Sequence, residues 1–205
     1  MKRILAAAAV SLLFASSANA LSVGLFELGI NRDGDQPTPA GVTYALDASG
    51  LGSVSVLVAG AGPHFVLGFF DFEAGSFFDD EFGGTSGTPG AGESWEIDEP
   101  DFSFGNIHSN FVAGLLDDTN GIAPGSVDDV AMALGRSLAP VGGSTQVTFF
   151  TSVEAPDAPF YLWQTDDETG TTIYLWSSVA AVPEPGALAL LGLGLGFLGA
   201  ARRRR

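Results

Sequence analysis

The sequence has no cysteine and has very few basic residues away from its two ends. Without cysteine the chain can form no disulfide, so its core must hold together by packing, and thiol catalysis and cysteine-type zinc sites are excluded. Residues 21–182 contain no lysine and only two arginines, Arg32 and Arg136. The same segment contains 23 of the 24 acidic residues, all except Glu184. Two positive and 23 negative charges therefore give it a formal charge of −21. Contacts to phosphate need a basic patch, so nucleic acid is excluded as a partner.

The middle of the chain consists of short apolar or alternating runs separated by Gly, Pro, Asp and Ser. This pattern is typical of strands joined by tight turns. It predicts roughly nine strands, at 21–30, 41–47, 53–59, 65–72, 94–97, 127–138, 146–153, 159–165 and 171–179. We therefore expect a mainly β fold, an antiparallel β-sandwich-like single domain flanked by an N-terminal signal peptide and a C-terminal transmembrane helix.

For four segments between or within these runs we make separate structural predictions. The glycine-rich segment 83–92 is predicted to be a mobile loop, and 166–170 is predicted to connect a hairpin. Segment 102–116 is open between a helix and a strand with a loop. In 127–138, the two aspartates at 128 and 129 are equally compatible with the start of a helix and with a continuing sheet.

The N-terminus has the three parts of an export signal. Lys2 and Arg3 precede an apolar stretch at 4–14, and Ala18-Asn19-Ala20 has the A-x-A form of a cleavage site. We expect residues 1–20 to be a signal peptide that the Sec translocon and signal peptidase handle, with Ala18 and Ala20 at the cleavage site. An N-terminal core helix is the alternative.

The C-terminus begins with Pro183, Glu184 and Pro185 and continues with an uncharged apolar run at 186–201. The run of 16 residues spans about 24 Å as a helix, slightly less than the ~30 Å bilayer core. It crosses if the terminal arginines snorkel or the bilayer thins locally. We expect a transmembrane helix followed by a cytoplasmic stop signal, with a buried hydrophobic helix as the alternative. The stop signal would be Arg202, Arg203, Arg204 and Arg205.

In this order the proline-glutamate-proline motif, the glycine-rich span and the arginine cluster resemble the PEP-CTERM sorting signal of exported Gram-negative bacterial proteins. The resemblance implies that an exosortase recognises Pro183, Glu184 and Pro185 and removes the tail. It also implies a transient anchor in the inner membrane, followed by a cell-surface or extracellular location. The predicted organisation is thus a signal peptide at 1–20, an acidic β-rich extracytoplasmic domain at 21–181 and the sorting tail at 182–205.

Several acidic segments are candidates for binding calcium. The segment 31–35 (Asn-Arg-Asp-Gly-Asp) faintly resembles a calcium loop, but position twelve would be Val42, so a plain hairpin turn is favoured. Acidic groups at 79–81, 117–118, 128–129 and 166–168 would bind calcium if they gathered at one end of a sandwich, but solvated loops are the favoured interpretation.

Other residues suggest chemistry only weakly. Acidic residues at 96, 98, 99 and 101 surround Trp95, as in a glycosidase with a sugar-stacking ring, but one segment does not define the spacing of a carboxylate pair. His64 and His108 accompany no Gly-x-Ser-x-Gly motif, so they are interpreted as ordinary loop or surface histidines. Trp163 and Trp176, on adjacent predicted strands, are expected to form a cross-strand pair, with stacking on a glycan as the alternative.

These observations favour a non-enzymatic exported protein with a structural or adhesive role, delivered to the cell surface or to an extracellular matrix where exopolysaccharide would be its partner. No catalytic residue and no cofactor is predicted, apart from the calcium alternative. A carbohydrate- or calcium-binding module is the second reading, and exposed tryptophans beside carboxylate loops would favour it. A secreted hydrolase that uses acidic residues is the third.

Overall fold

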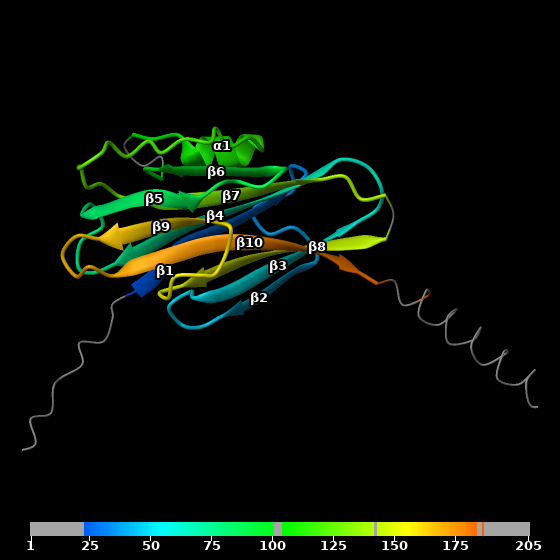
Figure 1. Ribbon diagram of the computed structural model, residues 1–205, viewed down its shortest axis with the longest axis horizontal. Coiled ribbons are helices and arrows are strands. Elements are labelled where there is room, and N and C mark those ends of the chain that lie inside the picture. The colour runs from blue at the N-terminus through cyan, green and yellow to red at the C-terminus, as the bar shows by residue number, and fades with distance from the viewer. Residues whose placement is uncertain (1–22, 101–103, 142, 184–185, 187–205) are drawn as a thin grey trace, which may run out of the picture.

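The computed structural model describes residues 23–100, 104–141, 143–183 and 186. In these residues ten strands form two antiparallel sheets (Figure 1). One sheet has the order β1 (Val23–Arg32), β4 (His64–Ala74), β7 (Ala131–Leu138) and β6 (Glu93–Asp98). The other has the order β2 (Val42–Leu46), β3 (Gly52–Ala59), β8 (Ser144–Ser152), β10 (Thr172–Val182), β9 (Phe160–Asp166) and β5 (Glu81–Gly87). The predicted mainly β, antiparallel two-sheet fold is confirmed.

The main hydrophobic core lies between the two sheets. Strands β4 and β7 contribute Phe70, Phe72 and Met132 from one side, and β8 and β3 contribute Phe149 and Val54 from the other. All five side chains are fully buried. Because side chains alternate along a strand, each of these strands has a second set of residues on its opposite face.

A second, smaller core lies on the outer face of the four-stranded sheet, under the short helix α1 (Ile107–Ala113). Leu67 and Phe69 of β4 pack there with Ile107 and Phe111 of the helix. The helix ends at Gly114, whose φ of 78° is the left-handed conformation that glycine adopts without strain. In the segment 102–116, left open between helix and strand, residues 107–113 form this helix, and β7 shows that the apolar part of 127–138 is a strand.

Strand β5 corrects the prediction of a mobile glycine-rich loop at 83–92. Residues 83–87 pair with β9, and Gly84 lies opposite Trp163. A Cβ atom at Gly84 would be only 2.5 Å from the Trp163 ring, so the glycine leaves space for the indole to cover the strand. The glycines of this segment therefore allow close packing between β5 and β9. Of the described strands, β5 is the one that is not among the nine predicted strands.

Strand β10 is a central strand that ends immediately before the proline-glutamate-proline motif. It pairs with β8 from Tyr174↔Ser152 to Val182↔Ser144. On its other side it forms the predicted hairpin with β9, which the 166–170 turn closes. Pro183 follows directly and is exposed.

The predicted signal peptide at 1–20, with Ala18 and Ala20, lies outside the described residues. So do most of the predicted transmembrane helix at 186–201 and the four terminal arginines. Within the described part of the chain, no helix combines the length and the apolar character needed to cross a membrane.

We expect truncation of Phe111 to weaken the contact between α1 and the four-stranded sheet. Phe111 is 2% exposed and its ring centroid lies 5.7 Å from that of Phe69. Phe111→Ala should lower the free energy of unfolding by about 3–5 kcal/mol, because it removes a buried ring and leaves a cavity. Val112→Ala is the matched control on the same helix, since Val112 is 45% exposed. Denaturant unfolding measures both, and equal effects would contradict the role assigned to Phe111.

Candidate functional site

The most unusual side chain of the described structure is Asp71 in strand β4. Phe70 and Phe72 point into the main core, whereas Phe69 points to the outer face under α1. Alternation therefore places Asp71 and Glu73 on the outer face, next in line after Phe69. Asp71 is only 1% exposed, and neither of its carboxylate oxygens has a hydrogen-bond partner. A buried polar group without a partner costs free energy, so this position requires an explanation.

Two further carboxylates lie beside Asp71. Each of Asp71, Glu73 and Asp129 has an oxygen within 4.8 Å of an oxygen of the other two. Asp129 comes two residues before Ala131, which pairs with Asp71 across β4 and β7, and so reaches the same face. On the other side, the register places Glu27 of β1 opposite Asp71. The cluster therefore joins β4 to the segment that leads into β7.

Crowding and burial raise the pKa values of these groups. Burial, followed by the charges of Asp129, Glu73 and Glu27, raises the pKa of Asp71 to about 8. Burial, followed mainly by Glu73, raises the pKa of Asp129 to about 7. The pKa of Glu73 is also raised, by burial and by Asp80. The three carboxylates thus repel one another in a poorly hydrated place.

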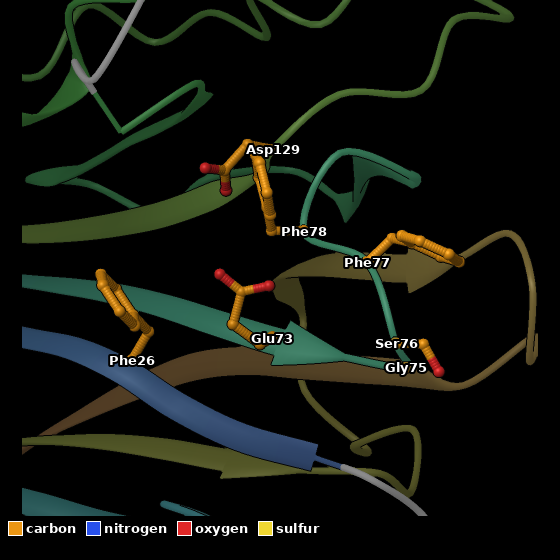
Figure 2. A pocket seen from close by; sticks show the side chains of 7 residues that line it. All are labelled: Phe26, Glu73, Gly75, Ser76, Phe77, Phe78 and Asp129. Carbon is orange, nitrogen blue, oxygen red and sulfur yellow. The ribbon is translucent and has the colours of Figure 1, made fainter.

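An open pocket of about 540 Å³ adjoins this cluster. Figure 2 shows the Glu73 carboxylate between the rings of Phe26 and Phe78, with Asp129 close by. The three phenylalanines that line the pocket, at positions 26, 77 and 78, are 61–65% exposed. The pocket therefore combines aromatic surface with two carboxylates of the cluster. Asp71 and Glu73 were not among the site residues predicted from the sequence. Their alternate positions in a phenylalanine-rich strand would have indicated two acids on the same face of that strand.

Three of the four predicted acidic groups do gather at the same end of the molecule. Glu81 exchanges backbone hydrogen bonds with Asp128, with N···O distances of 3.0 and 2.8 Å, and pairs with Asp166 across β5 and β9. The group at 117–118 lies elsewhere, because Asp118 accepts a hydrogen bond from the Trp95 amide and Asp117 accepts bonds from Thr119. The four groups therefore do not all gather at one end, and the calcium alternative that would require this fails for the group at 117–118.

Glu81 is buried next to this end of the sheet and is hydrogen-bonded. Its carboxylate accepts bonds from the Ala74 amide at 3.1 Å and from the Gln164 side-chain amide at 2.9 Å. Burial is the main reason that its pKa rises to about 9. Glu81 thus holds β5, β4 and β9 together as a neutral acid over most of the physiological pH range.

The segment 31–35 is a tight turn, as predicted. Arg32 and Asp35 form an antiparallel bridge around Asp33 and Gly34, whose φ angles of 57° and 89° match a type I′ turn. Asn31 is buried, and its amide donates a 2.7 Å hydrogen bond to the Phe111 carbonyl oxygen. The residue that resembled a calcium ligand therefore anchors α1 to β1.

The histidines have identifiable surroundings. His64 Nδ1 lies 2.8 Å from a carboxylate oxygen of Asp33, and its buried Nε2 has no hydrogen-bond partner. His108 packs edge-on against Phe69 with 5.6 Å between ring centroids, and its Nε2 lies 3.9 Å from Glu27. Within the part of the chain that the structure describes, His64 therefore pairs with an aspartate and with no serine hydroxyl.

The carboxylates near Trp95 do not share a face with its ring. Trp95 and Ile97 pack toward the main core, so alternation in β6 places Glu96 and Asp98 on the opposite face. Glu96 is fully buried and accepts a 2.9 Å hydrogen bond from Asn110 of α1. This arrangement contradicts the idea of a stacking ring beside a carboxylate pair. Asp101 lies outside the described residues.

The predicted pairing of Trp163 with Trp176 is also wrong. Trp163 lies opposite Tyr174 in the register and packs edge-on against Phe82, whereas Trp176 stacks on Phe150 with 5.2 Å between centroids. Trp176 lies two residues along β10 from Tyr174, the residue opposite Trp163, so the two tryptophans are not directly opposite and each ring packs on a different neighbour. All three tryptophans are half-buried.

The comparison with known protein families concerns the end of the chain. These observations define a two-sheet β protein with a carboxylate-lined pocket, whose last strand leads directly into the proline-glutamate-proline segment. Residues 181–205 match the family model described as the PEP-CTERM protein-sorting motif. The chain therefore carries a PEP-CTERM sorting motif, which confirms the resemblance seen in its sequence. This motif implies export and membrane-associated processing by an exosortase.

No curated protein and no solved structure matches this chain. Of the sorting residues, Pro183 is described and exposed, whereas Glu184, Pro185 and Arg202 to Arg205 lie outside the described residues.

We expect Glu81 to make the protein less stable as pH rises. A folded-state pKa of about 9, above the ordinary value of 4.5, means that the folded state retains a proton that the unfolded state releases. The free energy of unfolding should therefore fall as pH rises from about 4.5 to about 9, with a slope of at most about 1.4 kcal/mol per pH unit from this group. Glu81→Gln removes the titration and should make the measured slope shallower.

Denaturant unfolding at several pH values measures this slope. Glu154→Gln is the control, because Glu154 is exposed and its substitution should leave the slope unchanged. An unchanged slope in Glu81→Gln would show that Glu81 does not hold its proton in the folded state.

Proposed function

We propose that this chain is an exported protein that its PEP-CTERM tail delivers to the cell surface or extracellular matrix, where it has a structural or adhesive role. The observation that carries this proposal is the sorting-motif match at residues 181–205, which begins in the last two residues of the final strand of a folded β domain. The match supports the route, and the composition and fold of the domain support the role.

The junction between the domain and the tail suits recognition by a processing enzyme. Alanines 180 and 181 are exposed at the end of β10, and Pro183 is exposed next to them. Proline has no amide hydrogen and disfavours helical angles in the residue before it, so the strand ladder ends here and the chain stays extended. An exosortase would bind this extended segment while the apolar run at 186–201 holds the chain in the inner membrane.

The acidic domain suits a role outside the cell. Its formal charge of −21 over residues 21–182 favours solubility and repulsion between copies, and it attracts cations or basic polymers. We assign it no catalytic reaction. Among the described residues, no nucleophile is bonded to the Asp33–His64 pair, whose His64 Nε2 has no hydrogen-bond partner, and the described carboxylates around Trp95 do not share a face with its ring.

The pocket beside Glu73 favours a second candidate function, a carbohydrate-binding module. Its three exposed phenylalanine rings offer faces on which a sugar ring can stack, and its two carboxylates can accept hydrogen bonds from sugar hydroxyl groups. Phenylalanines here take the place of the exposed tryptophans expected for such a module.

We expect the sorting motif to be required for processing. In cells that produce an exosortase, replacement of Pro183, Glu184 and Pro185 with alanine should leave an uncleaved form in the membrane fraction, because the enzyme loses the segment that it recognises. Immunoblots of fractionated cells would measure this form. Pro156→Ala with Asp157→Ala, in an exposed loop between β8 and β9, is the control and should be processed normally. Normal processing of the motif variant would contradict the sorting role.

We expect the processed protein to remain with the extracellular polysaccharide. Cells that lack the gene should form a matrix that coheres less, and the processed protein should co-sediment with exopolysaccharide in the parent strain. Restoring the wild-type gene should recover cohesion, whereas the motif variant should not. An unaltered matrix together with a freely soluble protein would contradict the structural or adhesive role.

A further inference from the structure

The geometry points to a binding site for a divalent cation of the calcium type, formed by the carboxylates of Asp71, Glu73 and Asp129. This inference concerns the β domain and goes beyond the proposed export and matrix role. It holds whether or not the neighbouring pocket takes a sugar. Four observations support it, and each is independent of the sorting motif.

The first observation is the burial of Asp71. Its side chain is 1% exposed, both of its oxygens lack a hydrogen-bond partner, and one of them lies within 4.8 Å of an oxygen of each of the other two carboxylates. Asp129 Oδ1 is likewise buried without a partner. Elsewhere in the described structure, the buried Asn31 amide and the Glu81 carboxylate are hydrogen-bonded. A bound cation would give the Asp71 oxygens the ligand that the protein does not supply.

The second observation is the spacing of the oxygens. Ca²⁺ binds oxygens at about 2.3–2.6 Å, so two oxygens on opposite sides of one ion lie about 5 Å apart. The three carboxylates have oxygens that all lie within 4.8 Å of one another, so one such ion would reach all three. Mg²⁺ demands a strict octahedron at about 2.0–2.1 Å and gives up its water ligands reluctantly, so a cluster of three carboxylates suits Ca²⁺ better.

The third observation is the chemistry of the donors. All three are carboxylates, and neither imidazole nor thiolate is in the group. Hard oxygen ligands suit calcium, magnesium and manganese, whereas zinc and copper sites usually include nitrogen or sulfur. Three carboxylates supply three to six of the six to eight oxygens that Ca²⁺ takes, and water can complete the shell.

The fourth observation is the absence of a protein cation in the described residues that would neutralise the cluster. The only arginines there are Arg32 and Arg136. Arg136 lies 2.6 Å from Glu93 and is bonded to Ser177, while Arg32 donates to the carbonyl oxygens of Ala40 and Leu57. Glu27 and Asp79 add further negative charge. A divalent ion would therefore neutralise charge that no described lysine or arginine balances.

The pocket provides a route for the ion. Glu73 and Asp129 line it (Figure 2), whereas the neighbouring Asp71 is buried and does not line it. An ion would therefore enter from solvent, meet Glu73 and Asp129 first, and keep water on its pocket side. Because Asp71 and Glu73 belong to β4 and Asp129 precedes β7, a bound ion would fasten these two segments and stabilise the folded state.

The test uses the full-length protein in detergent micelles, treated with chelator and then dialysed at fixed pH. Wild type, Asp71→Asn, Asp129→Asn and the control Asp157→Asn are titrated with CaCl₂ by calorimetry, and their melting temperatures are measured with and without millimolar CaCl₂. The Asp157 side chain is exposed in the loop between β8 and β9, outside the cluster. MgCl₂ is titrated into wild type to compare the two ions.

We expect one Ca²⁺ per chain in the wild type and in the control, with a dissociation constant at or below about 1 mM, and a higher melting temperature with CaCl₂. Asp71→Asn and Asp129→Asn should each weaken binding at least about tenfold and lose the thermal shift, because each removes a ligand. Without calcium, Asp71→Asn should melt at or above the wild-type temperature, since it removes a buried charge. Mg²⁺ should bind more weakly than Ca²⁺.

The absence of heat and of a thermal shift in the wild type at millimolar CaCl₂ would overturn the proposal. Equal Ca²⁺ affinity in wild type and in both cluster variants would also overturn it, since binding would then occur elsewhere. If Asp71→Asn fails to fold, Asp129→Asn alone decides by the same criterion. The sorting-motif variant should bind Ca²⁺ as the wild type does, so a failure of this proposal is distinguishable from a failure of the export proposal.

Discussion

The burial of strand β4 on both faces is the constraint on which the rest of this structure depends. Phe70 and Phe72 fill the core between the sheets, while Leu67 and Phe69 fill the smaller core under α1. A strand that is covered on both sides has no solvated face on which to place a charged residue. Asp71 therefore lies in a dry position next to Phe69, and the elevated pKa values of the cluster follow from that position.

Because the domain has so few basic residues, no described arginine or lysine is available to balance the acidic cluster around Asp71. Both described arginines hold strands together through backbone and side-chain contacts, so neither is available to the acidic end of the molecule. The buried acids there have three means of lowering their charge: protonation, a shared hydrogen bond or a bound cation. Glu81 combines a raised pKa with hydrogen bonds, whereas Asp71 has no hydrogen bond at all.

The sequence predicted the strands better than the contacts between them. The strand predicted at 53–59 corresponds to β3, in which Val54, Val56 and Val58 are buried, and the pattern at the C-terminal end led to the sorting motif. The prediction failed where the cause was a neighbour distant in sequence. Gly84 is in a strand because Trp163 covers it, and no local pattern contains that information. The Asp71 cluster likewise depends on the register that brings Asp129 beside β4.

The path of β10 has a mechanical consequence. This strand lies between β8 and β9, pairs with β8 from Tyr174 to Val182, and leads straight into Pro183. A pull on the tail would therefore act along the strand, at right angles to the hydrogen bonds that join it to β8. Those bonds would bear the load together in shear and would not open one after another. A domain tethered through this strand is built to resist tension from its point of attachment.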